Sequence, residues 1–280
     1  MAQFILSAFG DEIDNDLSKQ LDALAELDIH HLELRGVWGV NVLDLDDTQV
    51  KQVKHMLDAR GFRVSAIGSP IGKSFIDQPR EYELQRLERA IQLAHALETP
   101  RVRVFSFYKP EGVSSWAGYR QEILDRIGQW TVRAEKAGIT LLHENERDIY
   151  GDIPERCLDI HHAVTSPALR NVFDPANYVL CSVKPMAEAW PLLGELTQHV
   201  HVKDATFSDQ SVRPAGEGDG DVPSLLQALV DQNYHGFLTL EPHLIFAGQY
   251  GGISGPDGMH MAAMALRKLI AQLPKQAEVR

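Results

Sequence analysis

The chain has 280 residues and a formal net charge of −12 at pH 7, from 27 basic and 39 acidic side chains. Its hydrophobic fraction of 44% is ordinary for a globular protein with a sizeable core. An acidic surface argues against nucleic acid and anionic membranes as partners. The two cysteines, Cys157 and Cys181, are too few for a disulfide framework, so we expect a cytoplasmic protein.

The N-terminal residues have no basic region before their short apolar run, so we interpret them as a first strand and not as a signal peptide. No apolar run in the chain approaches the roughly 18 residues that a membrane span requires. We therefore expect no membrane association.

Apolar runs of strand length alternate with longer segments of helical period along the chain. In the first half we expect, in order, strand Phe4–Phe9, helix Asp14–Leu27, strand His31–Leu34, helix Asp46–Ala59, strand Arg63–Ile67, helix Arg80–Leu97, strand Val102–Phe107 and helix Trp116–Ala137. In the second half we expect strand Thr140–His143, a helix beginning near Pro154, strand Asn171–Phe173, helix Met186–Leu196, strand His199–Val202, helix Ser224–Asp231, strand Gly236–Leu240 and helix Met259–Leu273.

Strict alternation of strands and helices implies a parallel sheet, and eight such units at this length favour a closed (β/α)₈ TIM barrel. The competing architecture is a doubly wound open sheet, which normally has a glycine-rich phosphate loop after an early strand. No such loop follows Phe4–Phe9. We expect one domain over residues 1–280.

Two predicted loops are unusually long, Ser208–Asp221 and Pro242–Gly258. Loops of this length in a compact domain are usually functional or unstructured. They are either substrate covers or subunit contacts, which would favour a homo-oligomer, or plain surface loops.

Four strand-like segments in the second half each end in, or just before, a residue that can bind a metal: Glu144, Asp174, His201 and Glu241. In a (β/α)₈ barrel the carboxyl ends of the strands converge on one rim. Three carboxylates and one imidazole suit a single divalent ion, and we expect Mn²⁺, Mg²⁺, Co²⁺ or Zn²⁺. Any one of these carboxylates alone would more often be a helix cap or half of a salt bridge.

Several segments resemble those of a known family: His143-Glu144-Asn145, Phe173-Asp174-Pro175-Ala176-Asn177, His199-Val200-His201-Val202-Lys203-Asp204, Leu240-Glu241-Pro242, Leu32-Glu33-Leu34-Arg35 and the glycine-rich run from Gly216 to Pro223. The chain is similar to the xylose isomerase-like TIM barrels and, more narrowly, to their sugar phosphate isomerase/epimerase group. The resemblance implies that the four residues bind one metal. It also implies that Glu144 and Glu241 face each other across the substrate as acid and base, as in the ketose 3-epimerases.

Three substrate contacts of those epimerases are replaced here. Asn177 stands where they have a histidine, Phe207 where they have an arginine, and Tyr150 where they have a glutamate. The endonuclease IV-like branch needs further histidines, and the third strand ends here at Ser69 without one. The metal ligands therefore carry over, whereas the contacts for a named sugar and the ligands of a nuclease do not.

Further candidates could contact a substrate. Glu33 could accept a substrate hydroxyl or form a rim salt bridge with Arg35. Asn177 could bind substrate or only cap a turn. His243 lies two residues past Glu241 and could reach the site if its loop folds inward.

Lys203 could hold a substrate oxygen, and we expect Asp204 to orient Lys203 or His201. His143 is expected to point away from the site and pack between strand and helix. We make the same prediction for His199.

These features predict a metal-dependent isomerase or epimerase of a small sugar or sugar-like polyhydroxy carbonyl compound, with a role in carbohydrate metabolism. The reaction would be proton transfer next to a carbonyl through a metal-bound enediolate, because a metal on the oxygens acidifies the neighbouring C–H and carboxylates can move the proton. A lyase or dehydratase of a keto-sugar or cyclitol could use the same first step. A different reading is a non-catalytic sugar-binding barrel or a subunit of a larger enzyme.

Overall fold

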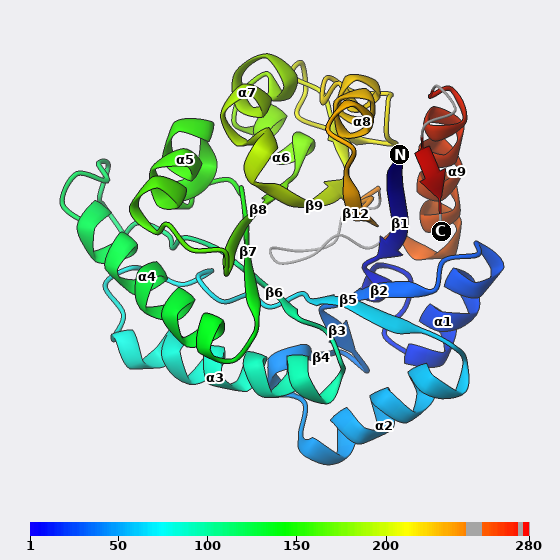
Figure 1. The fold of residues 1–280 in the computed structure, drawn as a ribbon, viewed down its shortest axis with the longest axis horizontal. Helices are drawn as coiled ribbons and strands as arrows, with labels where there is room; N and C mark the ends of the chain where they lie inside the picture. The colour runs from blue at the N-terminus through cyan, green and yellow to red at the C-terminus, as the bar shows by residue number, and fades with distance from the viewer. Residues whose placement is uncertain (245–253, 274–276, 280) are drawn as a thin grey trace.

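Eight parallel strands close into a barrel in the computed structural model, which describes residues 1–244, 254–273 and 277–279. The barrel strands are β1 (Ala2–Ala8), β2 (His31–Leu34), β5 (Arg63–Ile67), β6 (Arg101–Val104), β7 (Thr140–Glu144), β8 (Leu169–Phe173), β9 (Thr197–Val202) and β12 (His235–Leu240). The ring is closed by β1 and β12, which pair in register from Gln3 with His235 to Ala8 with Leu240 (Figure 1). The predicted (β/α)₈ barrel is confirmed.

Helices surround the barrel on its outside (Figure 1). They are α1 (Leu17–Glu26), α2 (Asp47–Ala59), α3 (Arg80–Ala96), α4 (Arg120–Lys136), α5 (Pro154–Ala163), α6 (Pro175–Leu180), α7 (Trp190–Leu193), α8 (Val222–Asp231) and α9 (Gly255–Ala271). Short helical segments of other types are η1 (Gly10–Glu12), η2 (Val42–Asp44), η3 (Tyr150–Asp152), η4 (Pro185–Ala189) and η5 (Gly194–Leu196). Within the described ranges, no helix has both the length and the apolar character needed to cross a membrane.

Local sequence explains where several helices start. The Asp46 carboxylate and the Gln49 side chain form a reciprocal capping box at the start of α2. Asp16 caps α1, which therefore begins at Leu17 and not at Asp14 as predicted. Pro154 occupies the first turn of α5, where its missing N–H costs no hydrogen bond.

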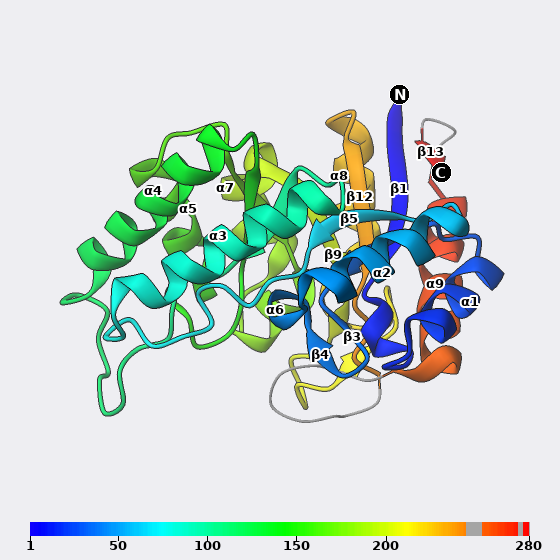
Figure 2. The same cartoon turned by 90° about the horizontal axis from the view of Figure 1, so that it is seen from below.

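The small antiparallel elements mark one end of the barrel. The hairpin β3 (Gly36–Val37)–β4 (Val40–Asn41) and helix α6 lie away from the end where β1 begins (Figure 2). At the carboxyl end of β9, β10 (Asp204–Ala205) pairs with β11 (Val212–Arg213). Part of the predicted loop Ser208–Asp221 is thus structured. Of the second long loop, residues 245–253 lie outside the described residues, and α9 starts at Gly255.

The fourth barrel strand is shorter than predicted. It ends at Val104, because the N–H groups of Phe105 and Phe107 bond to the carbonyls of Ile71 and Gly72 instead of to a barrel strand. A Cβ on Gly72 would lie 2.2 Å from the Phe105 carbonyl oxygen, so only glycine fits this close approach.

The helix predicted over Met186–Leu196 is broken into η4, α7 and η5. The break coincides with Pro191, which has no N–H to donate and whose ring crowds the preceding turn. The helix predicted from Trp116 starts later, at Arg120, and α6 and the strand β13 (Ala277–Val279), which pairs with the first residues of β1, were not predicted.

Candidate metal centre

The four strand-end residues converge at the carboxyl rim of the barrel. Each offers a ligand atom, and these atoms lie within 4.8 Å of one another: Glu144, Asp174, His201 and Glu241. All four side chains are buried. A cluster of three carboxylates and one imidazole in this space matches what a single divalent ion requires.

The strand register explains the convergence. Glu144 ends β7 beside Val172 of β8, and His201 of β9 lies beside Thr239 of β12. Side chains two residues along a strand share a face, so Asp174 and Glu241 point into the same space as these neighbours. Residues separated by up to 97 positions in the chain thereby meet at one point.

Two of the buried atoms that face this point, Oδ2 of Asp174 and Nδ1 of His201, have no partner in full hydrogen-bonding geometry among the described residues. Oδ2 of Asp174 does form an ion pair with the ammonium of Lys203, at 2.9 Å. Nδ1 of His201 lies 3.0 Å from Oε1 of Glu144 and 3.7 Å from Oε2 of Glu241. A buried nitrogen that faces only carboxylate oxygens is costly when it carries no proton, and a cation bound between them would satisfy both. The residues present therefore fit a divalent metal.

The candidate site is crowded with carboxylates. Glu144, Asp174 and Glu241 lie there with Glu33, and Arg35, Arg103 and Lys203 pair with members of this group. The crowding is also visible in Asp174, whose pKa is raised to about 7 by burial, with Glu144 and Glu241 adding to the shift.

The comparisons with known proteins assign the family. A family model described as "Xylose isomerase-like TIM barrel" matches residues 21–270. The chain belongs to this family. The resemblance found in its motifs is thus confirmed.

Among curated relatives of this xylose isomerase-like barrel, the uncharacterized protein MJ1311 of Methanocaldococcus jannaschii is 28% identical over 184 residues, which cover 60% of this chain and 59% of that protein. Fructoselysine 3-epimerase of Shigella flexneri is 23% identical over 212 residues, covering 71% of this chain and 74% of the epimerase. Among solved structures, a D-tagatose 3-epimerase-like protein superposes with a TM-score of 0.74 at 21% identity, over 96% of this chain and 97% of the other.

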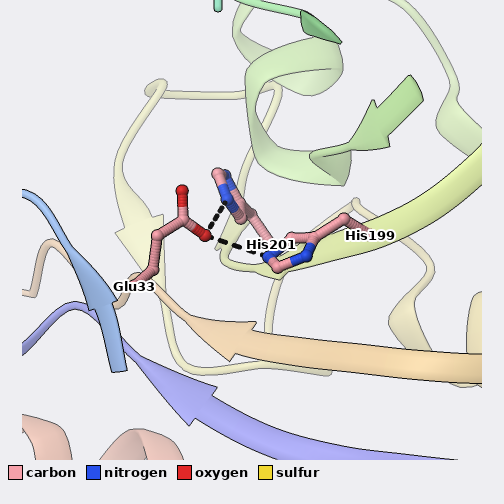
Figure 3. Close-up of side chains that lie close together, drawn as sticks. All are labelled: Glu33, His199 and His201. Atoms are coloured by element: carbon pink, nitrogen blue, oxygen red, sulfur yellow. Dashed lines mark hydrogen bonds and ion pairs between the residues drawn. The ribbon is translucent and has the colours of Figure 1, made fainter. Parts of the chain in front are cut away.

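Glu33 pairs with two histidines and not with Arg35, although a salt bridge to Arg35 was one of its two expected roles. Its Oε2 lies 3.1 Å from Nε2 of His201 and 2.9 Å from Nε2 of His199 (Figure 3). Burial opposes the ionisation of Glu33, but the two imidazoles hold its pKa well below the usual range. The prediction that His199 packs outside the barrel is wrong, because residues 199 and 201 share one face of β9.

Two arginines in the site were not predicted. Nη1 of Arg103 on β6 lies 3.1 Å from Oε2 of Glu144, and Nη1 of Arg35 lies 3.1 Å from Oε1 of Glu241. The sequence signal was weak: both arginines stand at or just beyond strand ends, where exposed basic residues are common. Glu12, just beyond β1, was also missed, and burial raises its pKa to about 8.

Lys203 lies inside the cluster. Its Nζ is 2.9 Å from Oδ2 of Asp174 and 3.0 Å from Oε2 of Glu241. Its pKa is raised well above the usual value, because the attraction of Asp174 and other carboxylates outweighs the effect of burial. Lys203 is therefore an ammonium ion.

Asp204 does not orient Lys203 or His201, contrary to the prediction. Its carboxylate accepts hydrogen bonds from the backbone N–H groups of Ala205, Gly216, Gly218 and Gly220, at 2.8–3.0 Å. A Cβ on Gly218 or Gly220 would lie 2.4 or 2.6 Å from Oδ1 of Asp204. Asp204 thus anchors the glycine-rich loop.

Asn177 and His243 are both close to the cluster. Nδ2 of Asn177 donates to Oε1 of Glu144 at 3.3 Å, while its backbone N–H donates to Oδ1 of Asp174 as part of the α6 cap. The backbone N–H of His243 donates to Glu12, and its half-buried ring lies 3.8 Å from Oε1 of Glu241.

The other positions that differ from the epimerases lie apart from the cluster. The Tyr150 hydroxyl donates to Asp159, and its ring packs against Trp116, while Phe207 is 38% exposed. His143 packs against His161 of α5, as predicted.

Proposed function

We propose that this chain is a divalent-metal-dependent isomerase or epimerase of a small sugar or sugar-like polyhydroxy carbonyl compound. The observation that carries the proposal is the meeting of two arginine-bound glutamates, Glu144 and Glu241, with Asp174 and His201 around one point. The relationship to the 3-epimerases supports the same reaction class. The cytoplasmic location and a homo-oligomeric state stay predictions.

The two glutamates have matching surroundings. In each, one oxygen contacts an arginine, Arg103 for Glu144 and Arg35 for Glu241, while the other oxygen lies beside His201. Burial opposes the ionisation of Glu241, but nearby positive charges, above all Lys203, hold its pKa well below the usual range. An ionised carboxylate fixed by an arginine can accept a proton without reorienting.

Glu144, Asp174, His201 and Glu241 would hold the metal, which when bound would polarise a substrate carbonyl and acidify the neighbouring C–H. One of the two glutamates would remove that proton, and the other would return one to the opposite face of the carbon. Lys203 and Asn177 are placed to donate hydrogen bonds to substrate oxygens.

Lys203 also supports the second candidate function, a lyase or dehydratase. β-Elimination of a hydroxyl group needs a proton donor for the departing oxygen. The buried ammonium of Lys203, 3.0 Å from Glu241, could supply it. A sugar-binding protein without catalysis has no need for two buried glutamates fixed by arginines, so this reading is disfavoured.

The test is solvent exchange. Metal-loaded protein is incubated in D₂O with ketoses, 3-keto sugars and cyclitol ketones, and the products are followed by mass spectrometry. We expect deuterium next to the carbonyl of at least one compound, with the isomer retaining all its atoms and a lyase product lacking one water.

Glu144→Gln and Glu241→Gln should each slow this exchange about 100-fold or more, because a general base or acid contributes on that order. Glu88→Gln, an exposed position on α3, is the matched control and should exchange like the unsubstituted protein. No exchange with any compound, or full exchange in both active-site variants, would contradict the proposal.

A further inference from the structure

Two histidine rings contact one oxygen of a buried carboxylate next to the candidate metal site. Oε2 of Glu33, on β2, lies 3.1 Å from Nε2 of His201 and 2.9 Å from Nε2 of His199 (Figure 3). All three side chains are 0–1% exposed. Figure 3 shows both rings turned toward the same oxygen.

This contact decides which nitrogen of His201 can bind a metal. A carboxylate only accepts hydrogen bonds, so the proton of a neutral His201 ring must sit on Nε2. Nδ1 then presents its lone pair toward Glu144, 3.0 Å away, and the rest of the cluster. In the other tautomer, the proton would point into the cluster and Nε2 would face a carboxylate without a proton between them.

Glu33 is itself held in place. Nε2 of His199 also lies 2.8 Å from Oγ1 of Thr239, and Nε of Arg103 lies 3.8 Å from Oε1 of Glu33. Two histidines and an arginine therefore surround the carboxylate. Oε2 is occupied by the two rings, and Oε1 faces Arg103 without a hydrogen bond.

We propose that Glu33 is a positioning residue that fixes the tautomer and orientation of His201, with His199 holding Glu33 from the other side. The inference rests on the proposed metal-dependent function and assigns Glu33 to the ligand and not to the substrate. Carboxylates that bind the distal nitrogen of a ligating histidine typically contribute 10- to 100-fold to metal affinity.

The test is a Co²⁺ titration followed by visible absorption, which reports both affinity and ligand arrangement. We expect Glu33→Gln to weaken binding about 10- to 100-fold and to change the absorption spectrum. Ser7→Ala is the matched control, because Ser7 forms a buried hydrogen bond to Ser65 in the barrel, at 2.7 Å, without touching a histidine. Its affinity and spectrum should stay those of the unsubstituted protein.

His199→Phe distinguishes the contribution of His199 from that of His201. It leaves the bond between Glu33 and His201 intact, so we expect a smaller loss of affinity than in Glu33→Gln. Equal binding and an identical spectrum for Glu33→Gln and the unsubstituted protein would overturn the inference alone. Failure of the unsubstituted protein to bind Co²⁺ would overturn the proposed function, and the inference with it.

A measurement on the unsubstituted protein covers the case in which Glu33→Gln does not fold. Long-range ¹H–¹⁵N NMR of the Zn²⁺-loaded protein should place the His201 ring proton on Nε2 and the metal on Nδ1. The opposite assignment would overturn the inference.

Discussion

At the scale of single residues, Lys203 occupies an unusual position, because its ammonium contacts two carboxylates that also face the proposed metal, Asp174 and Glu241. A lysine here has two consequences. It stabilises the carboxylates in the metal-free protein, and it competes with the metal for the same negative charge. Both consequences can be measured by removing the ammonium.

Lys203→Met should lower the free energy of unfolding in EDTA by about 3–5 kcal/mol, because breaking a buried ion pair leaves its partner uncompensated. Saturating Mn²⁺ should close most of this gap, since an ion that binds only the folded state stabilises it. Urea denaturation with and without Mn²⁺ measures both values. Lys51→Met, exposed on α2, is the control, and a gap that Mn²⁺ does not change would contradict the competition.

The convergence of Glu144, Asp174, His201 and Glu241 was predictable from sequence because each stands at or next to a strand end, and barrel closure brings strand ends together whatever the loops do. The places of Arg35 and Arg103 in the site were not predictable, because the carboxylates that they contact, Glu241 and Glu144, lie on strands far away in the chain. His199 could have been placed correctly, because two residues along a strand return to the same face. The error lay in treating it like His143, which directly precedes Glu144.

At the scale of elements, the glycine-rich loop after β9 depends on one side chain. Asp204 accepts two backbone N–H bonds at each carboxylate oxygen, from Ala205 and Gly220 at Oδ1 and from Gly216 and Gly218 at Oδ2. An asparagine keeps the size but loses two of these bonds in either orientation of its amide.

Asp204→Asn should therefore cost about 2 kcal/mol of stability and speed hydrogen exchange in residues 205–220, with metal affinity unchanged. Denaturation, exchange mass spectrometry and metal titration measure the three effects. Glu217→Gln, exposed in the same loop, is the control. Weakened metal binding with an unchanged loop would instead support the original assignment of Asp204 to orienting the site.

The contact between β7 and α5 contains two buried histidines. Burial lowers the pKa of His143 to about 3, with the charge of His161 adding to the shift. Burial also lowers the pKa of His161 to about 4, with Arg170 and His162 adding to the shift. Both values lie below the ordinary 6.5, so the unfolded chain binds these protons more readily than the folded one. The stability they permit is complete above pH 6.5 and falls as the pH drops toward 4.

His161→Leu should make the free energy of unfolding depend less on pH. Between pH 6.5 and 4 the variant should lose up to roughly 3 kcal/mol less than the unsubstituted protein loses. Chemical denaturation across that range measures it, with His55→Gln, exposed on α2, as the control. An unchanged slope in His161→Leu would show that other groups dominate acid unfolding.

The ends of a helix were predictable where neighbouring residues in the sequence mark them, as Asp46 and Gly61 do for α2. Boundaries that depend on distant residues were less predictable. The strand expected over Val102–Phe107 ended early because its last residues bond to the segment at Ile71 and Gly72. That partner is distant in sequence and has no strand pattern. Helix α6 was missed because six residues are too few for a helical period to be recognised.

At the scale of the whole molecule, the strand–helix alternation determined the architecture, and the architecture determined the site. A closed barrel puts eight strand ends on one rim. The second half of the chain can therefore supply all four residues of the cluster, while β2 and β6 supply the charged side chains of Glu33 and Arg103 beside it. The substrate was not predictable, because Asn177, Tyr150 and Phe207 differ from the epimerase contacts and the sequence offers no replacement pattern.

The most direct test of the metal site is isothermal titration of the metal-free protein with Mn²⁺, for the unsubstituted chain and for Asp174→Asn. The asparagine can keep the oxygen that caps α6 while an NH₂ group replaces Oδ2, the oxygen that faces the cluster and Lys203. We predict one ion per chain for the unsubstituted protein and the loss of that binding in the variant. Absence of binding, or equal affinity in both proteins, would contradict the assignment of a divalent metal to this site.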